Sequence, residues 1–415
     1  MPSPRILISG ASVAGPALAF WLNRAGWDTT VVERFDGLRD TGHNIDVRGA
    51  AREVVKRMGI YDVLLASRTG EQGTEFLDSR GRSIAVFPRS ETAVDGATAE
   101  LEILRGELAR ILVETTDDTT EYLFDDQITA LDDTGDHVDV TFRRSGKRAF
   151  DAVVIAEGLT SRTRRLIMPD ADITRVGLYT AYLTMPRTSE DNDYWRWYNA
   201  VDSRSVMTRP DNLGTIRALL SFMTNVRGLE ELPQDEVTGL LRRTFSDVGW
   251  VTPRVLDALD DGPYYFDAIG QMRLPRWSTG RVGLVGDAAY CASPLSGMST
   301  SLALVGAYVL AGELASTGDP VTAFGRFEQI MRPYVDRAQK LPPGGPRLGQ
   351  PRSRAGIGAV HTLARALASR PAQKLAVFDR LSRTAADTFE LPDYFPAATT
   401  TTTARPSTVA HRRIA

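Results

Sequence analysis

The stretch RILISGASVAGPALAFWLNRAGWDTTVVE, residues 5–33, contains a short apolar run, a glycine-containing turn, a helical pattern and a β-branched run, in that order. Residues 5–9 have the composition of a buried parallel strand. Residues 15–26 have helical spacing and stop at Gly26, and residues 29–33 have the β-branched composition of a strand. The order strand, turn, helix, strand predicts a βαβ unit and therefore a parallel sheet.

The turn in this unit, GASVAG at residues 10–15, follows the pattern G-x-G-x-x-G except that Ser12 stands in the middle glycine position. Small residues there let backbone N–H groups approach a pyrophosphate at the helix N-terminus, where the helix dipole favours anions. Glu33 ends the second strand, where an acidic side chain can bind ribose hydroxyls. The combination predicts dinucleotide binding, and a tight turn without a ligand is the alternative.

The composition is that of an ordinary globular protein: 415 residues, 42% hydrophobic and 24% charged, which excludes collagen-like, coiled-coil and wholly disordered chains. A formal net charge of -3 gives no reason to expect nucleic acid or a membrane surface as a partner. The single cysteine, Cys291, cannot form an intramolecular disulfide, and the four histidines lack ligand-like partners. We therefore expect no metal site and a cytoplasmic location.

Two uncharged stretches, residues 6–23 and 288–312, imitate membrane signals. Gly, Ser and Pro interrupt both of them, so we expect a strand and helix in the first stretch and a loop with a core helix in the second.

The middle of the chain has successive strand-like runs in place of alternating strand and helix patterns. Four strand-like runs occur there, at residues 178–184, 194–199, 205–208 and 215–223. The parallel-strand pattern returns at residues 280–286. These patterns predict an α/β fold in four parts: a Rossmann-like domain with a parallel sheet from residues 1–168 and 274–340, an inserted domain with a mainly antiparallel sheet from 169–273, a C-terminal helix at 352–390 and a disordered tail at 396–415.

A second motif lies in VGLVGDAAYCASPLSGMSTSLALVGAYVLAGEL, residues 282–314. A buried strand ends at Gly286-Asp287, and a loop rich in Ser, Pro and Gly then opens a helix. An aspartate at a strand end can bind a sugar hydroxyl, and N–H groups at a helix N-terminus can face an electron-rich ring edge. Ordinary packing is the alternative for this segment taken alone.

These segments together resemble the class A flavoprotein monooxygenases, the aromatic hydroxylases related to para-hydroxybenzoate hydroxylase and the tetracycline-inactivating monooxygenases. The turn at residues 10–15 with Glu33-Arg34 is similar to the turn of that family that binds the ADP part of FAD, and residues 286–304 are similar to its GDA block. AEGLTSRTRR, residues 156–165, resembles its fingerprint D-G-x-x-S-x-x-R, with Glu157 in place of Asp. Arg105 is a weaker match. The motifs span residues 5 to about 315 in the family's order.

The resemblance implies FAD as the cofactor and NADPH or NADH as the cosubstrate. It assigns FAD contacts to residues in six groups: Gly10, Ser12, Val13, Ala14 and Gly15 at the pyrophosphate; Glu33 and Arg34 at the adenosine; Arg105 and Asp287 at the diphosphate or ribityl region; Pro294 and the N–H groups of Gly297 and Met298 at the flavin ring; Asp46 and Arg48 on a loop that borders the flavin; and Glu157 and Gly158 in the fingerprint shared with the nicotinamide cofactor.

The resemblance further implies an NAD(P)H- and O₂-dependent hydroxylase of an aromatic or polyketide-like small molecule, which acts through a C4a-hydroperoxyflavin. It also implies a role in secondary metabolism. Because the oxidant belongs to the cofactor, no catalytic side chain is predicted. Trp195 and Trp197 share a face of one strand and, with Phe222, can line a pocket for a planar substrate; core packing is the alternative. An FAD-binding dehydrogenase or a non-oxygenating accessory flavoprotein is the alternative function, and we expect a monomer or homodimer.

Overall fold

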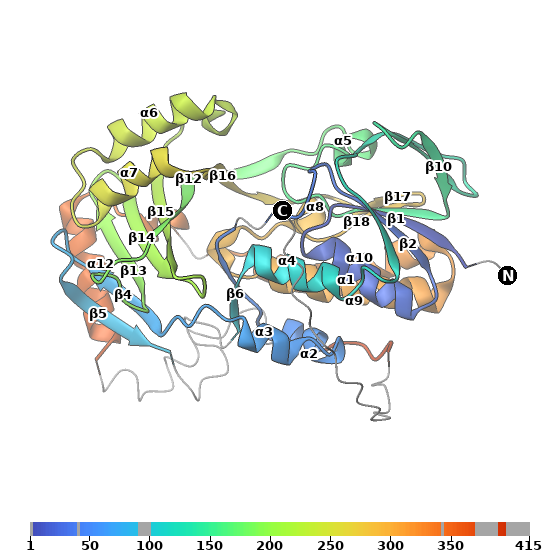
Figure 1. Ribbon diagram of the computed structural model, residues 1–415, viewed down its shortest axis with the longest axis horizontal. Helices are drawn as coiled ribbons and strands as arrows, with labels where there is room; N and C mark the ends of the chain where they lie inside the picture. Colours follow the sequence, from blue (N-terminus) through green and yellow to red (C-terminus); the bar gives the residue numbers. More distant parts are fainter. Residues whose placement is uncertain (1–2, 40–41, 90–100, 342–343, 370–388, 396–415) are drawn as a thin grey trace.

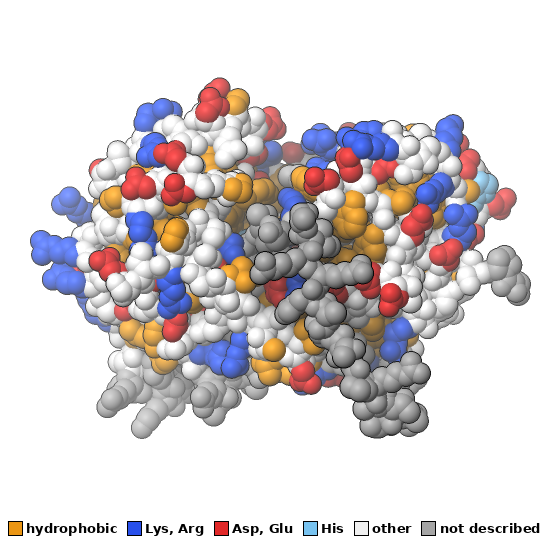
Figure 2. Space-filling view, in the orientation of Figure 1, with side chains coloured by type: hydrophobic (Ala, Val, Ile, Leu, Met, Phe, Trp, Pro, Cys, Tyr) orange, Lys and Arg blue, Asp and Glu red, His pale blue; other side chains and the backbone are white. Residues whose placement is uncertain are grey.

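The computed structural model describes residues 3–39, 42–89, 101–341, 344–369 and 389–395. Two regions lie side by side in Figure 1, each built on its own sheet. The long strands β12 (Ile173–Pro186) and β16 (Tyr265–Met272) reach from one region into the other. In the face shown in Figure 2, acidic and basic side chains are interspersed, as expected from a net charge of -3.

The first region is built on a six-stranded sheet. Its strands, in spatial order, are β17 (Ser278–Thr279), β18 (Val282–Leu284), β11 (Ala152–Ile155), β1 (Arg5–Ser9), β2 (Asp28–Val32) and β7 (Thr120–Leu123). All neighbouring pairs except β17–β18 are parallel. The predicted βαβ unit is confirmed as β1, helix α1 (Ala14–Arg24) and β2.

Helices cover one face of this sheet and a smaller sheet covers the other (Figure 1). The helices are α1, α9 (Ser299–Thr317) and α10 (Pro320–Ala338), and the smaller sheet consists of β8 (Ile128–Asp133), β9 (Val138–Phe142) and β10 (Lys147–Phe150). Helix α9 is long and apolar enough to cross a bilayer, but 78% of its most apolar window is buried in the protein. It is therefore a core helix, as predicted.

The second region is built on a seven-stranded, mainly antiparallel sheet. The strands, in spatial order, are β16, β12, β15 (Thr215–Met223), β14 (Arg204–Pro210), β13 (Trp195–Ala200), β4 (Gly73–Leu77) and β5 (Ser83–Pro88). Helices α6 (Gln234–Phe245) and α7 (Thr252–Asp261) pack on one face of it and bury a second hydrophobic core. The predicted fold class, with a parallel sheet and a mainly antiparallel one, is thereby confirmed.

The division of the chain differs from the prediction at one point. Strands β4 and β5 come from the segment assigned to the first domain, but β4 pairs in parallel with β13 and so extends the second sheet. A strand-like run does not reveal its pairing partner, because pairing depends on residues distant in the sequence.

The remaining strands and α-helices connect these elements or pack against them. They are β3 (Asn44–Asp46), which pairs with β6 (Glu102–Leu104), and helices α2 (Ala50–Arg57), α3 (Tyr61–Ala66), α4 (Arg105–Glu114), α5 (Arg164–Ile167), α8 (Asp287–Tyr290), α11 (Pro346–Gly349) and α12 (Arg354–Leu367). Helix α12 forms part of the predicted C-terminal helix; residues 370–388 and the predicted tail lie outside the described residues.

Candidate active site

Three predicted segments leave the first sheet side by side. Strands β1, β11 and β18 are parallel neighbours, so their carboxyl ends meet at one edge. The N–H of Ala156 donates to the carbonyl of Ser9 at 2.7 Å, and the N–H of Val285 donates to that of Ile155 at 3.0 Å. The segments that begin at Gly10, Ala156 and Gly286 therefore border the same space.

Two glycines make the first turn possible. Gly10 has a φ of 115°, and a Cβ there would lie 2.7 Å from the carbonyl oxygen of Ala156. A Cβ at Gly15 would lie 1.9 Å from the carbonyl oxygen of Gly10. The backbone of residues 10–15 can therefore lie close to the neighbouring strand and to any ligand above it.

Helix α1 begins at this turn without a side-chain cap and without an acidic residue in its first turn. Its first N–H groups, which include those of the predicted residues Val13 and Ala14, are thus available to an anion. The Glu33 carboxylate lies at the same turn, where it accepts hydrogen bonds from the N–H of Ala11 at 2.9 Å and of Phe35 at 3.3 Å. The guanidinium of Arg34 lies 4.8 Å from the centre of the Phe35 ring.

Arg105 reaches the turn from the N-terminus of α4. Its Nη1 donates to Ser12 Oγ at 3.0 Å, and its backbone N–H donates to the carbonyl of His43 at 3.1 Å. Burial lowers the pKa of Arg105, with the charge of Arg39 acting in the same direction. A pyrophosphate would supply the negative charge that such a buried cation favours.

The fingerprint at residues 156–165 forms a turn held together by Glu157. The carboxylate of Glu157 accepts hydrogen bonds from Ser9 Oγ at 2.5 Å, from Ser161 Oγ at 2.7 Å and from both the N–H and the hydroxyl of Thr163. These bonds give Glu157 a structural role in the turn, and its contact with a cofactor stays a prediction. Gly158 next to it has a φ of 83° and allows the chain to turn.

Arg164 is a site residue that the prediction missed. It is 2% exposed, and its guanidinium donates to the carbonyl of Ala288 in α8 at 3.0 Å and to that of Leu159 at 2.7 Å. It therefore connects the segment after β11 to the segment after β18. The signal was present in the sequence, because Arg164 is the final arginine of the fingerprint.

The segment after β18 contains Asp287 and the N-terminus of α9. Burial raises the pKa of Asp287. Pro294 lies in a short 3₁₀ turn, Gly297 is exposed with a φ of 63°, and α9 begins after Met298 without a side-chain cap. One expectation needs correction: the N–H of Gly297 donates to the carbonyl of Pro294, and that of Met298 donates to Ser296 Oγ at 3.1 Å. The donors available at this end are instead those of the first turn of α9.

The loop that contains Asp46 and Arg48 meets the same helix end. The two side chains form an ion pair at 2.8 Å and are only 16% and 9% exposed, so this is not a solvated turn. The N–H of Arg48 donates to Ser301 Oγ, in the first turn of α9, at 3.0 Å. This contact places the loop beside the segment predicted to border a flavin ring.

The predicted substrate residues lie on two different faces of the second sheet. Trp195 and Trp197 stack with their ring centres 5.5 Å apart, on the face opposite α6 and α7. Phe222 is 6% exposed and belongs to the core beneath those helices, in contact with Phe245 of α6. This corrects the expectation for Phe222, because strand alternation directs it away from any cavity on the tryptophan face.

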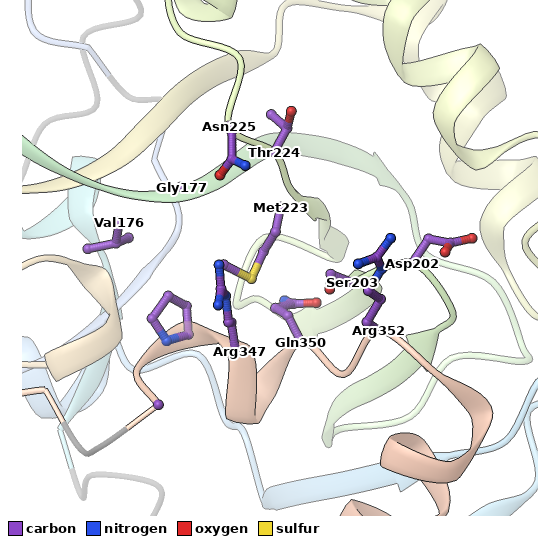
Figure 3. Close-up of a pocket in the computed structure, with 12 residues that line it drawn as sticks. Val176, Gly177, Asp202, Ser203, Met223, Thr224, Asn225, Arg347, Gln350 and Arg352 are labelled. Atoms are coloured by element: carbon purple, nitrogen blue, oxygen red, sulfur yellow. The ribbon is translucent and has the colours of Figure 1, made fainter.

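A cavity of about 820 Å³ opens between this sheet and α11 (Figure 3). Its lining residues come from four segments: Val176 and Gly177 of β12, Asp202 and Ser203, Met223 to Asn225 at the end of β15, and Gly344 to Arg352 around α11. Gly270 of β16 pairs with Arg175 beside it, and the next residue, Gln271, donates to the carbonyl of Ala292 at 3.0 Å. The cavity wall is therefore one strand away from the loop that precedes Pro294.

Comparison with known proteins gives a family match, two similar relatives and one similar solved structure. Residues 4–319 match the FAD binding domain family. A flavin-dependent monooxygenase from an unknown prokaryotic organism is 38% identical over 340 residues, which cover 81% of this chain and 87% of that protein. The FAD-dependent monooxygenase asL4 of Sarocladium schorii is 32% identical over 429 residues, 95% of this chain and 99% of that protein. The crystal structure of the tetracycline destructase Tet(55) superimposes with a TM-score of 0.77 at 32% identity, covering 94% of this chain and 99% of that one.

Proposed function

The chain belongs to the class A, FAD-dependent flavoprotein monooxygenases, and from this premise we propose that it uses NADH or NADPH and O₂ to hydroxylate an aromatic or polyketide-like small molecule. The resemblance seen in the sequence is thereby confirmed. The observation that supports the substrate class is the cavity of about 820 Å³, one strand away from the loop at Cys291–Pro294, with a volume in the range of small-molecule sites.

The residues at the edge of the first sheet fit FAD chemically. The uncapped N-terminus of α1 and the cation of Arg105 suit the diphosphate, and the Glu33 carboxylate suits ribose hydroxyls. The uncapped N-terminus of α9 supplies N–H donors beside Pro294, where an electron-rich ring edge is favoured. When bound, FAD supplies the redox chemistry and the activation of O₂.

The protein itself has to bind, orient and keep water out. We assign the binding of the planar part of the substrate to the cavity between β12, β15 and α11. Trp195 and Trp197 stack on each other, with Arg209 over Trp195 and Phe76 stacked on Trp197, and we propose that they shape the face of the sheet toward the substrate. The buried Asp46–Arg48 pair holds the loop against α9 and limits solvent access from that side. Orientation of the reacting ring carbon then follows from the position of the cavity relative to the loop at Cys291–Pro294.

The names of the relatives support the proposed substrate class. Tet(55) is named a tetracycline destructase, which favours a polycyclic substrate for this chain also. We propose either NADH or NADPH as the donor. The one dinucleotide turn in the sequence, residues 10–15, is assigned to FAD, so no second motif distinguishes the two donors. We also propose that the protein is cytoplasmic and is a monomer or a homodimer. A dehydrogenase or an accessory flavoprotein is not proposed, because the two relatives described above, at 38% and 32% identity, are both named as monooxygenases.

The test is a screen of phenolic polycycles, including a tetracycline, with purified FAD-loaded protein in air. NAD(P)H consumption is followed by absorbance, and products are analysed by mass spectrometry after reaction in isotopically labelled O₂. The proposal predicts ligand-stimulated NAD(P)H oxidation coupled to a product that carries one labelled oxygen atom. Oxidation that no ligand stimulates, with no labelled product, would overturn it.

A further inference from the structure

A buried charge cluster lies where the second sheet meets the loop that borders the candidate flavin site. Arg209, in β14, donates from Nε and Nη2 to the carboxylate of Glu71 at 2.8 and 3.1 Å. Its Nη2 also lies 3.0 Å from Glu102 Oε2, in β6. Glu71, Glu102 and Arg209 are 2%, 3% and 9% exposed. Two carboxylates therefore share one guanidinium away from water.

Neutral donors tie the cluster to both regions. Asn44 Nδ2 donates to Glu102 Oε1 at 2.6 Å and to the carbonyl of Pro210, next to Arg209, at 3.0 Å. Thr69 Oγ1 donates to Glu102 Oε1 at 2.9 Å. Asn44 begins β3 and Glu102 begins β6, and these two strands pair with each other. The cluster thus joins the end of β14 to the two strands that lead to the Asp46–Arg48 pair and to Arg105.

The cluster also fixes one of the two stacked tryptophans. The guanidinium carbon of Arg209 lies 4.4 Å from the centre of the Trp195 ring, a distance typical of a cation–π contact. Trp195 in turn stacks on Trp197. A change in the charge of the cluster therefore acts on the stacked pair Trp195 and Trp197 as well as on β3 and β6.

Among the described residues, Arg209 is the cation that contacts both carboxylates of the cluster. The charged groups on the adjacent elements pair with each other: Asp46 with Arg48, Asp211 with Arg217, and Asp193 with Arg187. Burial, with the charges of Arg105 and Arg209, lowers the pKa of His43 to about 3, so this ring is neutral. Burial raises the pKa of Glu71 to about 8, and the charge of Glu102 acts in the same direction, against Arg209.

We propose that Glu71 carries a proton at neutral pH and that Glu71, Arg209 and Glu102 act together as positioning residues. They hold Trp195 and the strands β3 and β6 in place, and the contacts between them loosen when Glu71 ionises. Loss of this proton to solvent places two negative charges against one guanidinium in a buried site, which weakens the contact between β14 and β6. The inference depends on the flavin site of the proposed function and is independent of the substrate.

Thermal unfolding as a function of pH tests the protonation without any ligand. A carboxyl whose pKa is higher in the folded than in the unfolded state makes the folded state bind more protons, so stability falls as pH rises from the ordinary carboxyl range through about 8. The wild type therefore loses melting temperature between pH 6 and pH 9 more steeply than Glu71→Gln, which cannot ionise. The matched control Glu75→Gln, at a carboxylate of β4 that contacts Arg196 at 3.6 Å, keeps the wild-type slope. Equal slopes in the wild type and Glu71→Gln would overturn the proposal.

Infrared difference spectroscopy gives a second readout, which a purely structural role would not change. The spectrum of the wild type minus that of Glu71→Gln at pH 7 is expected to contain the C=O stretch of a protonated carboxylic acid, and this band is expected to disappear at pH 10. Absence of the band at pH 7 would show that Glu71 is ionised and would overturn the proposal.

Titration with FAD connects the cluster to the flavin site. The dissociation constant of FAD is expected to rise between pH 7 and pH 9.5 by about threefold or more in the wild type, and by less in Glu71→Gln. The double variant Glu71→Gln/Glu102→Gln leaves Arg209 without a carboxylate and is expected to bind FAD more weakly than Glu71→Gln at every pH. An equal rise in the wild type and Glu71→Gln would contradict the positioning role. Complete absence of FAD binding in the wild type would instead defeat the proposed function, and the melting and infrared measurements would still test the protonation.

Discussion

Arg105 Nη1 donates a hydrogen bond to Ser12 Oγ at 3.0 Å, which joins the N-terminus of α4 to the turn that opens α1. This contact explains why serine occupies the position where the turn pattern has glycine. A glycine would leave the backbone equally free to approach a pyrophosphate, but it would offer no acceptor for the guanidinium. The departure from the pattern thus holds the guanidinium of Arg105 at the turn that we propose binds the diphosphate.

The first prediction concerns this contact. Ser12→Ala is expected to weaken FAD binding about three- to tenfold, because loss of one hydrogen bond to a charged group costs about 1 kcal/mol here. Ser246→Ala removes the hydroxyl of an exposed serine that donates only to the carbonyl of Arg243, and it serves as the control. The dissociation constants are measured by quenching of FAD fluorescence. An unchanged constant in Ser12→Ala would show that Ser12 does not orient Arg105.

The second prediction concerns the approach of the turn to β11. Gly10→Ala is expected to lower the free energy of unfolding by about 1–3 kcal/mol more than Gly26→Ala. Both glycines have positive φ, 115° and 82°, but only the Cβ at position 10 meets another atom, the carbonyl oxygen of Ala156 at 2.7 Å. Urea denaturation of the two variants measures the difference. Equal destabilisation would mean that the backbone at Gly10 is not closely packed.

The third prediction concerns Arg164. Arg164→Met leaves the carbonyls of Ala288 and Leu159 without this donor and is expected to cost about 2–4 kcal/mol of stability. FAD binding is expected to weaken with it, because Arg164 holds α8 against the turn after β11. Arg165→Met, at the exposed neighbouring arginine, is the matched control and should stay within about 0.5 kcal/mol of the wild type. Similar losses in both variants would contradict the connecting role of Arg164.

The fourth prediction concerns the cavity. Met223→Trp places a larger side chain in the lining and is expected to reduce ligand-stimulated NAD(P)H oxidation about tenfold, with little change in FAD affinity. Leu213→Trp, at a side chain that is 65% exposed, adds the same ring outside the cavity and serves as the control. The ratio of the two stimulated rates is the measurement. If Met223→Trp keeps the wild-type response to ligand, the substrate binds elsewhere.

Local patterns were sufficient to predict the βαβ unit and its turn. The βαβ unit, the glycines at positions 10 and 15 and the acidic residue at 33 lie within one continuous stretch, so their spacing could be recognised without knowledge of distant contacts. The family resemblance implied that the segments at Glu157 and Asp287 contact one cofactor, and the pairing of β1, β11 and β18 brings both segments to the same sheet edge.

Features that depend on distant partners were not predicted. The pairing of β4 with β13 and the cavity wall around α11 arise from contacts between segments far apart in the sequence. Phe222 lies on the face of the sheet opposite Trp195 and Trp197. Side chains alternate between the two faces of a strand, so a one-residue difference in phase moves a side chain to the opposite side. The N–H of Met298 was assigned to a ligand, but Ser296, two residues earlier, accepts it.

Hydrogen exchange of the backbone amides, with and without FAD, tests most directly the claim that the segments after β1, β11 and β18 bind one flavin nucleotide. We predict that FAD slows exchange in residues 10–15, in residues 156–158 and around the start of α9 together, with one common midpoint when FAD is titrated. Protection confined to one of these segments, or FAD binding that leaves all three unprotected, would contradict the account.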